Sequence, residues 1–351
     1  MAHSPLPDHT SCNGDTVTAA STKSVPVILP SVTTTAFRGA GRPYALRHSN
    51  GSLLAAMYKE EGLVLVPIAM GTEEMEAVIL AGVLRRAGAD VTVASVEDGL
   101  EVEASCGSRI VADTHIASCA DQVFDLVALP MTQIDVNLER STEVNELEWS
   151  IDHNPHVLIP IANGSEEMEI IILVDILRRA KINVVLASAE KSPNIVGSQR
   201  MKIVADKSIS SASNSKFDLI ILPVSFHAVH LFVWMGGTAG ADRLQRSTIL
   251  KKLLKEQKQA GRMYGGLSSS LKILQQQGLL EDKIVTAHPS VANGLTCQVI
   301  DRSKIVIDGN LITGKGIGTA VDFALAIIRK FFGHGRAKSV ANGIVFEYPK
   351  S

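Results

Sequence analysis

The pattern of apolar and polar residues repeats along this chain. Residues 64 to 97 and residues 157 to 190 each contain a continuous apolar run, a Gly followed by three glutamates, an amphipathic segment and a second apolar run. This order predicts a strand, a tight turn, a helix and a strand. Continuous apolar runs are typical of strands buried on both faces, and a helix usually connects two such parallel strands. Each copy is therefore predicted to be one βαβ unit.

The two copies stay in register well beyond this unit. Their offset of 93 residues holds without a gap as far as Pro130 and Pro223. A period this long is too large for a solenoid and indicates duplication of part of a domain. The chain continues far beyond Pro223, whereas the second copy begins soon after Pro130. We therefore predict a truncated repeat over 61–150 and a complete domain over 151–351.

The truncated repeat raises a packing problem. Three parallel strands without the rest of the sheet leave a large apolar face uncovered. We expect this face to pack on the second domain or on a partner chain. Residues 131–149 are polar and acidic, and we interpret them as a linker with a weak helix.

The complete domain carries two unusual stretches. An aromatic segment at 224–235 follows a buried strand, where a short turn into a helix is normal, so we interpret it as an insertion. A short strand then meets a sharp turn at Ser268 and enters a helix, which is the layout of a nucleophile elbow. A plain turn of small residues, without chemistry, is the alternative.

Further elements follow from the remaining pattern. A helix is predicted over 241–260, strands over 305–307 and 311–313, and a final helix over 323–332. The Gly-rich turn at 314–319 lacks the context of a dinucleotide fingerprint, so a packing role is favoured over phosphate binding.

Residues 1–60 differ in composition from the rest of the chain. They are rich in Ser, Thr and Pro, basic and poor in acids. We predict a disordered organellar transit peptide directed to the chloroplast, with the mitochondrion as an alternative. A plain disordered tail on a cytoplasmic protein is a third interpretation. Met57 could also serve as an internal start, which would remove the targeting argument.

Charge and hydropathy exclude some partners. The formal net charge is only −2, which gives no nucleic-acid footprint. No apolar run approaches the roughly 18 residues of a spanning helix, so we expect no membrane partner. The four cysteines show no metal-ligand or redox spacing and are interpreted as reduced thiols. We expect no metal and no cofactor.

Several motifs, taken in order, resemble the DJ-one family, also called PfpI/ThiJ, of the class I glutamine-amidotransferase-like superfamily. Their co-occurrence in one order makes the resemblance specific, and a duplicated member with a transit-like leader resembles the plant plastid-type branch. The matching residues are Gly164 to Glu169, Arg178 to Ala180, Phe217 to Pro223 with Gly236 and Gly237, Tyr264 to Gly266, His288 with Pro289, and Gly314 to Thr319 leading into Phe323 to Ile327.

The resemblance implies an α/β fold with a flavodoxin-like parallel sheet sandwiched by helices. It also implies a cofactor-free glyoxalase or deglycase acting on small α-oxoaldehydes such as methylglyoxal, or a stress-sensing protein, usually as a homodimer. Contact within the chain, or another protein partner, is the alternative to a homodimer. Carried over by position, the glutamate is Glu169, the histidine is His288 and the nucleophile position is Ser268. Backbone amides near Gly237 and Ser269, with Gly236, would bind the substrate oxygen.

The departures from the family pattern bear on whether this protein can catalyse the family reaction. The family keeps a cysteine at the elbow, and a serine hydroxyl needs an adjacent general base where a thiol does not. Oxidation to a sulfinic acid is impossible for serine. The insertion also separates Pro223 from Gly236, and the first repeat lacks both the elbow and the histidine.

Three interpretations follow. The first is a non-catalytic protein, a pseudoenzyme of plastid development or stress response. The second is a weak glyoxalase or hydrolase in which Ser268 and His288 form a dyad. The third is that the short first repeat and the insertion are errors of gene prediction or splicing, which predicts a longer transcript that joins Pro223 directly to Gly236.

Overall fold

The computed structural model describes residues 62–130, 142–145, 147, 149–224 and 239–348. All of these residues belong to one compact unit. The predicted leader at 1–60 lies outside the described residues, and so does the predicted insertion apart from Val224. Among the helices that the structure describes, none is both long and apolar enough to span a bilayer.

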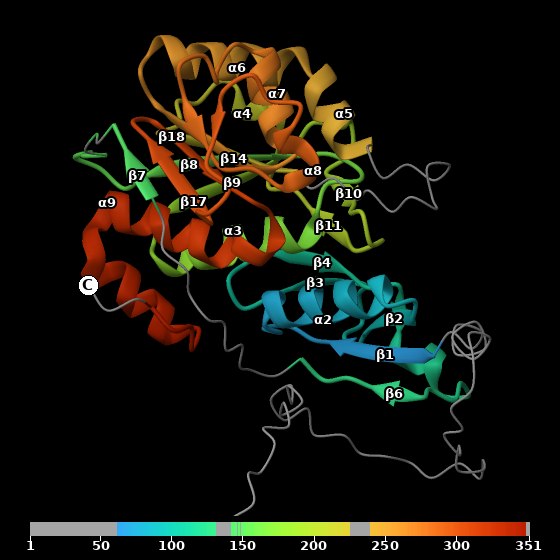
Figure 1. The fold of residues 1–351 in the computed structure, drawn as a ribbon. Coiled ribbons are helices and arrows are strands. Elements are labelled where there is room, and N and C mark those ends of the chain that lie inside the picture. Colours follow the sequence, from blue (N-terminus) through green and yellow to red (C-terminus); the bar gives the residue numbers. More distant parts are fainter. Residues whose placement is uncertain (1–61, 131–141, 146, 148, 225–238, 349–351) are drawn as a thin grey trace, which may run out of the picture. The chain divides into compact units, whose positions relative to one another are not determined.

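The first repeat forms a four-stranded parallel sheet in the order β5-β2-β1-β6 (Figure 1). The apolar run predicted as a strand is β1, and the amphipathic segment is α2, which begins directly after Thr72 and Glu73. The bounds are β1 Leu63–Ile68, α2 Glu74–Arg86, β2 Asp90–Ser95, β3 Glu101–Glu103, β4 Arg109–Val111, β5 Thr114–His115, η1 Ile116–Cys119 and β6 Leu126–Val127.

The second repeat forms the same four strands in the same order and extends them. Its sheet runs β12-β9-β8-β13-β14-β18-β17-β7, and only β17 is antiparallel to its neighbour β18. The bounds are β7 Thr142–Val144, β8 His156–Ile161, α3 Glu167–Arg179, β9 Asn183–Ser188, β10 Asn194–Val196, β11 Lys202–Val204, β12 Lys207–Ser208, α4 Ile209–Ala212, β13 Leu219–Val224, α5 Ala239–Arg246, α6 Thr248–Gln259, β14 Met263–Ser268, α7 Ser270–Gln276, β15 Ile284–Val285, α8 Pro289–Ala292, β16 Gln298–Val299, β17 Ile305–Asp308, β18 Leu311–Gly314, η2 Ile317–Thr319 and α9 Ala320–Gly343.

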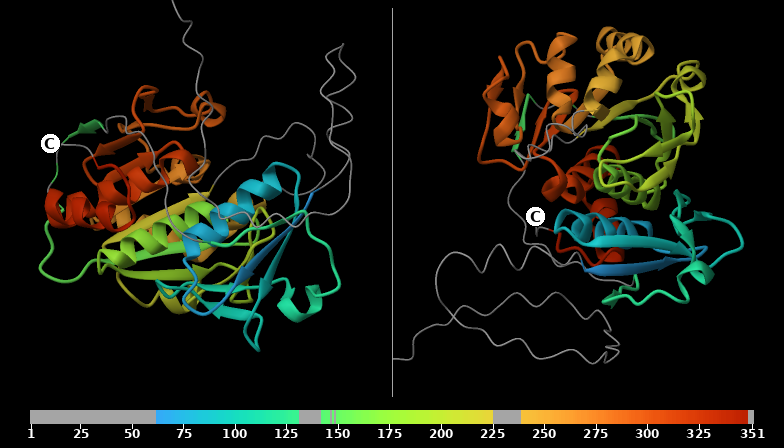
Figure 2. Two further views of the ribbon diagram at one scale, coloured as in Figure 1. Left: turned by 90° about the horizontal axis from the view of Figure 1, so that it is seen from below. Right: turned by 90° about the vertical axis from the view of Figure 1, so that its right-hand side faces the viewer.

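Helices cover both faces of the large sheet, as Figures 1 and 2 show. Because side chains alternate along a strand, Val157 and Ile159 of β8 pack with α3 and α9, whereas Leu158 packs on the other face with α4, α6 and α7. The predicted fold class, a flavodoxin-like parallel sheet sandwiched by helices, is therefore confirmed.

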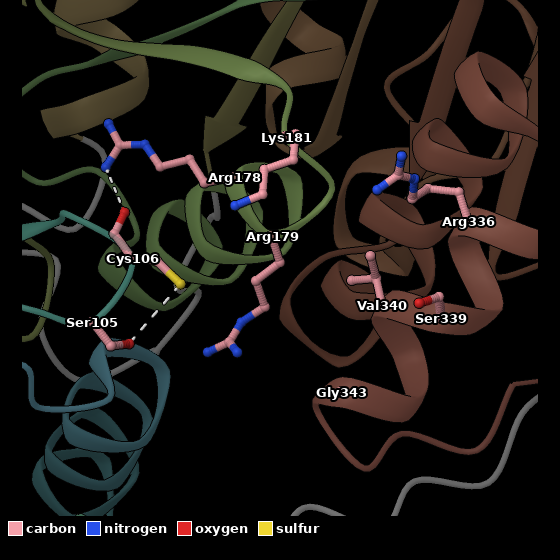
Figure 3. Close-up of a pocket in the computed structure, with 9 residues that line it drawn as sticks. All are labelled: Ser105, Cys106, Arg178, Arg179, Lys181, Arg336, Ser339, Val340 and Gly343. Atoms are coloured by element: carbon pink, nitrogen blue, oxygen red, sulfur yellow. Dashed lines mark hydrogen bonds between the residues drawn. The ribbon is translucent and has the colours of Figure 1, made fainter.

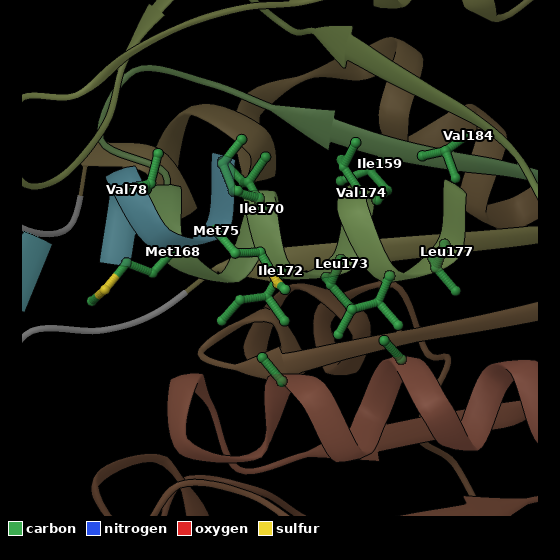
Figure 4. Packing of buried hydrophobic residues seen from close by; sticks show 14 of the residues in the cluster. Met75, Val78, Ile159, Met168, Ile170, Ile172, Leu173, Val174, Leu177 and Val184 are labelled. Atoms are coloured by element: carbon green, nitrogen blue, oxygen red, sulfur yellow. The ribbon is translucent and has the colours of Figure 1, made fainter. Parts of the chain in front are cut away.

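The apolar face of the first repeat is covered within the chain. Met75 and Val78 of α2 belong to the same buried cluster as Met168 and Ile172 of α3 (Figure 4). This confirms the expectation that the first repeat packs on the second domain. The other face of its sheet is covered less well, and Val127 of β6 is exposed.

A pseudo-two-fold axis relates the two repeats. Strands β4 and β11 pair antiparallel, and Ile110 lies opposite Ile203, its own counterpart at the offset of 93. The pairing joins both hairpins into one sheet, β10-β11-β4-β3. In an isologous two-fold interface, each surface pairs with its own equivalent, as β4 and β11 do here.

Ion pairs across the interface follow the same axis. Arg86 of α2 donates to the buried Glu166 at 2.7 Å, and its counterpart Arg179 of α3 donates to Glu73 at 2.7 Å. Burial raises the pKa of Glu167, the next acid at the start of α3, and the charge of Glu166 adds to this shift. The repeats are thus docked through matched polar contacts as well as apolar ones.

Some predicted elements differ from the structure. Residues 142–144, expected to form a linker with a weak helix, form the strand β7, which pairs with the free edge of β17. The helix predicted over 241–260 is interrupted at Ser247, whose hydroxyl caps α6 by accepting from the Leu250 amide at 3.2 Å. The last helix runs beyond 332 to Gly343, with a break in helical geometry at Gly333.

Candidate functional site

The elbow has the predicted geometry. Ser268 ends β14 with a φ of +48°, in the left-handed region, and α7 begins two residues later. A non-glycine residue held in this region indicates local strain, which is typical of functional sites. Gly266 is required two residues earlier, because a Cβ there would lie 2.1 Å from the Ser270 hydroxyl oxygen. The small residues around Ser268 therefore allow the chain to turn sharply.

Glu169 lies beside this elbow. It is fully buried in the first turn of α3. A Cβ built on Gly316 would lie 3.5 Å from Glu169 Oε1 and 3.6 Å from Ser268 Cβ. Glu169 and Ser268, far apart in the sequence, therefore flank the same turn.

The turn at 314–319 is thus part of the site and not only a packing element. Gly316 has a φ of +142°, which a side chain would strain. Thr319 Oγ1 fixes the turn by accepting from the amides of Lys315 at 3.1 Å and Gly316 at 3.2 Å. In the sequence, this turn could be recognised by a glycine three residues before a threonine whose hydroxyl can bond back to the turn.

His288 makes its hydrogen bonds to Ser290 and not to the serine hydroxyl. It is exposed at the N-terminus of α8, where Nδ1 accepts from the Ser290 amide at 3.2 Å and lies 2.7 Å from the Ser290 hydroxyl oxygen. Ser268 Oγ is buried and has no hydrogen-bond partner among the described residues. The structure therefore places Glu169 beside Ser268 and does not join Ser268 to His288.

The predicted oxyanion donors are described only in part. Ser269 is buried at the start of α7, and its carbonyl accepts from the Lys272 amide at 3.0 Å. Gly236 and Gly237 lie outside the described residues. The role of these amides in binding stays a prediction.

The cysteines that the structure describes do not replace the missing thiol. Cys106, Cys119 and Cys297 are free and none stands at the elbow. Burial, with the nearby Asp175 and Glu74 charges, raises the pKa of the Cys106 thiol to about 11, and burial also raises the pKa of Cys297. Both groups are protonated near neutral pH, so neither is an activated nucleophile.

A parallel sheet between helices, with a strained residue at a strand-to-helix elbow beside a buried glutamate, defines a protein of the class I glutamine-amidotransferase-like fold. The sequence model of the DJ-1/PfpI family matches residues 63–135 and 155–330. The chain belongs to the DJ-1/PfpI family.

Individual relatives agree with this assignment. The chain is 31% identical over 395 residues to protein DJ-1 homolog B of Arabidopsis thaliana, covering 80% of this chain and 87% of the relative. It is 28% identical over 187 residues to the glutathione-independent glyoxalase DJR-1.2 of Caenorhabditis elegans, covering 52% of this chain and 91% of the relative. The crystal structure of Drosophila melanogaster DJ-1beta matches at a TM-score of 0.51 and 31% identity, covering 56% of this chain and all of that one.

Proposed function

We propose that this chain is a DJ-1/PfpI-like pseudoenzyme that keeps the family pocket without its nucleophile and acts by binding. The observation that carries this proposal is the buried Ser268 hydroxyl, which stands at the strained elbow without a hydrogen-bond partner among the described residues. A serine nucleophile needs a base that accepts its proton within hydrogen-bond reach. Glu169 is close to the elbow, but a carboxylate is a weak base toward an alcohol.

The alternative is a weak glyoxalase or deglycase acting on α-oxoaldehydes such as methylglyoxal. It is supported by the position of Glu169 and Ser268 on either side of Gly316 and by the glyoxalase named among the relatives. In this alternative, Ser268 Oγ attacks the aldehyde carbon and its proton passes to the Glu169 carboxylate. The overall conversion adds water to methylglyoxal and gives lactate, so no external oxidant or reductant is needed.

An assay with the Ser268→Ala variant separates these two functions. We expect methylglyoxal consumption by the purified wild-type protein to be no faster than by the Ser268→Ala variant, because no described residue accepts a hydrogen bond from the Ser268 hydroxyl. Lactate formation gives the second readout. Wild-type turnover that the alanine variant abolishes would establish the glyoxalase alternative.

We further propose a plastid location, with a role in plastid development or stress response. Its support is the Ser/Thr-rich, basic and acid-poor composition of residues 1–60. Residues 1–60 fused to a fluorescent protein are expected to carry it into chloroplasts of plant cells, while the full chain started at Met57 stays outside. Fluorescence of the fusion in mitochondria or cytoplasm would contradict this proposal.

A further inference from the structure

A second group of reactive side chains lies at the docking face of the two repeats, away from the elbow. It borders a cavity of about 470 Å³. Figure 3 shows Ser105 and Cys106 of the first repeat on one side, Arg178, Arg179 and Lys181 at the end of α3, and Arg336 of α9 opposite. The cavity gives solutes access to the Cys106 side of the interface.

Three potential ligand atoms converge beside this cavity. One side-chain atom each of Glu74, Cys106 and Asp175 lies within 4.8 Å of the other two. Glu74 belongs to α2 and Asp175 to α3, and both are fully buried. Buried carboxylates are costly unless they are paired or bind a cation.

The Glu74 carboxylate is only half satisfied. Oε2 accepts from the Ser105 hydroxyl at 3.0 Å and from the Cys106 amide at 3.1 Å. Oε1 is buried and has no hydrogen-bond partner among the described residues. The Glu74 carboxylate, which lies in a cluster with the Cys106 thiol and the Asp175 carboxylate, therefore keeps one buried acceptor oxygen for a ligand.

The pseudo-two-fold axis provides an internal comparison. At the related position, Glu167 Oε1 accepts from the Gln199 amide at 2.7 Å, and Oε2 accepts from the Ser198 hydroxyl at 3.0 Å. There Gln199 stands where the first site has Cys106, and Gly82 stands where it has Asp175. Of the two positions related by the axis, only the first therefore combines a thiol, a second acid and an unsatisfied carboxylate oxygen.

We propose that Glu74, Cys106 and Asp175 form a binding site for Zn²⁺. A thiolate favours Zn²⁺ over Mg²⁺ or Ca²⁺, and carboxylate oxygens are accepted zinc ligands. Tetrahedral zinc needs about 3.5 Å between sulfur and oxygen ligands, so side-chain rotation closes the site. On binding, the thiol loses its proton to solvent and forms the Zn–S bond, and water from the cavity takes the fourth position.

The basic residues around the cavity are compatible with this site because the nearest ones are already engaged. Arg179 donates through Nε to Asp175 Oδ1, through Nη2 to Asp175 Oδ2 at 3.2 Å, and to Glu73, and so holds the Asp175 carboxylate in place. Arg178 pairs with Asp206 at 3.0 Å and donates to the Cys106 carbonyl. A carboxylate that accepts from an arginine still has lone pairs for a metal. Outer-shell partners such as this arginine commonly orient metal ligands.

The site would connect the two repeats. Glu74 and Cys106 come from the first repeat, whereas Asp175 comes from the second. A ligand that binds only the docked arrangement stabilises it by mass action. Zn²⁺ is therefore expected to raise the unfolding temperature of the chain in a concentration-dependent way.

Cobalt substitution tests the site directly. The full chain, freed of metal with a chelator and kept reduced, is titrated with Co²⁺ while sulfur-to-cobalt charge transfer is followed in the ultraviolet. We expect a band that saturates at one equivalent, is absent in Cys106→Ser and is unchanged in the matched control Cys297→Ser. Circular dichroism checks that both variants are folded.

Other results would overturn the proposal. These are no band in the wild type, a band that persists in Cys106→Ser, or a band that Cys297→Ser removes. The Zn²⁺-dependent rise in unfolding temperature gives a second measurement, expected in the wild type and lost in Asp175→Asn. An equal rise in both proteins would exclude Asp175 as a ligand.

Discussion

Replacing Arg86 by Ala is expected to lower the free energy of unfolding by about 3 kcal/mol, because it removes the cation from a buried carboxylate. Glu166 is fully buried and accepts from Arg86 Nη2 at 2.7 Å across the interface between the repeats. The Ser198 hydroxyl still donates to Glu166 in the variant, but this hydroxyl carries no charge that could balance the carboxylate. Urea denaturation of wild type and variant at one pH measures the difference.

A double variant separates loss of the charge pair from loss of packing. Arg86→Ala combined with Glu166→Gln is expected to recover much of the stability, since the charge of Glu166 is removed together with the cation that balances it. The exposed pair of Lys252 and Glu256 is the control, and Lys252→Ala should change the free energy by less than about 0.5 kcal/mol. Equal losses for Arg86→Ala and Lys252→Ala would contradict the account of the interface.

Replacing Gly265 by Ala is expected to cost at least about 3 kcal/mol, or to prevent folding. A Cβ there would lie 2.2 Å from the Ile312 carbonyl oxygen of the neighbouring strand. Strand β14 cannot move away, because it is paired with β13 on one side and β18 on the other.

Gly318 provides the matched control for this substitution. A Cβ at Gly318 would meet no heavy atom within 4 Å. Gly318→Ala is therefore expected to change the free energy of unfolding by less than about 0.5 kcal/mol. Thermal unfolding of the two variants compares them, and a Gly265→Ala protein as stable as Gly318→Ala would show that the strands can separate locally.

The elements of both repeats could be predicted from the sequence because local pattern and burial agree. Apolar runs such as Leu63–Ile68 are strands, and the small residues after Tyr264 produce the elbow at Ser268. The strand at Thr142–Val144 could not be predicted, since its three residues lack an apolar pattern. It forms because the edge of β17 offers unpaired backbone groups.

Contacts between distant residues lie beyond sequence reasoning. The spacing of Glu74, Cys106 and Asp175 matches no metal-ligand motif, so the sequence predicts no metal, and only the docking of α2 on α3 brings the three together. The position of Gly316 beside Glu169 and Ser268 likewise depends on the whole sheet. Residues that are adjacent along the chain were the easier part of the site to predict.

The Ser268→Cys variant tests most directly whether the family pocket is intact apart from its nucleophile. A thiol forms a thiolate far more readily than a hydroxyl loses its proton, so methylglyoxal consumption should rise at least about tenfold above wild type. Adding Glu169→Gln should remove the gain. A Ser268→Cys variant as inactive as the wild type, although folded, would show that the pocket has lost more than its nucleophile.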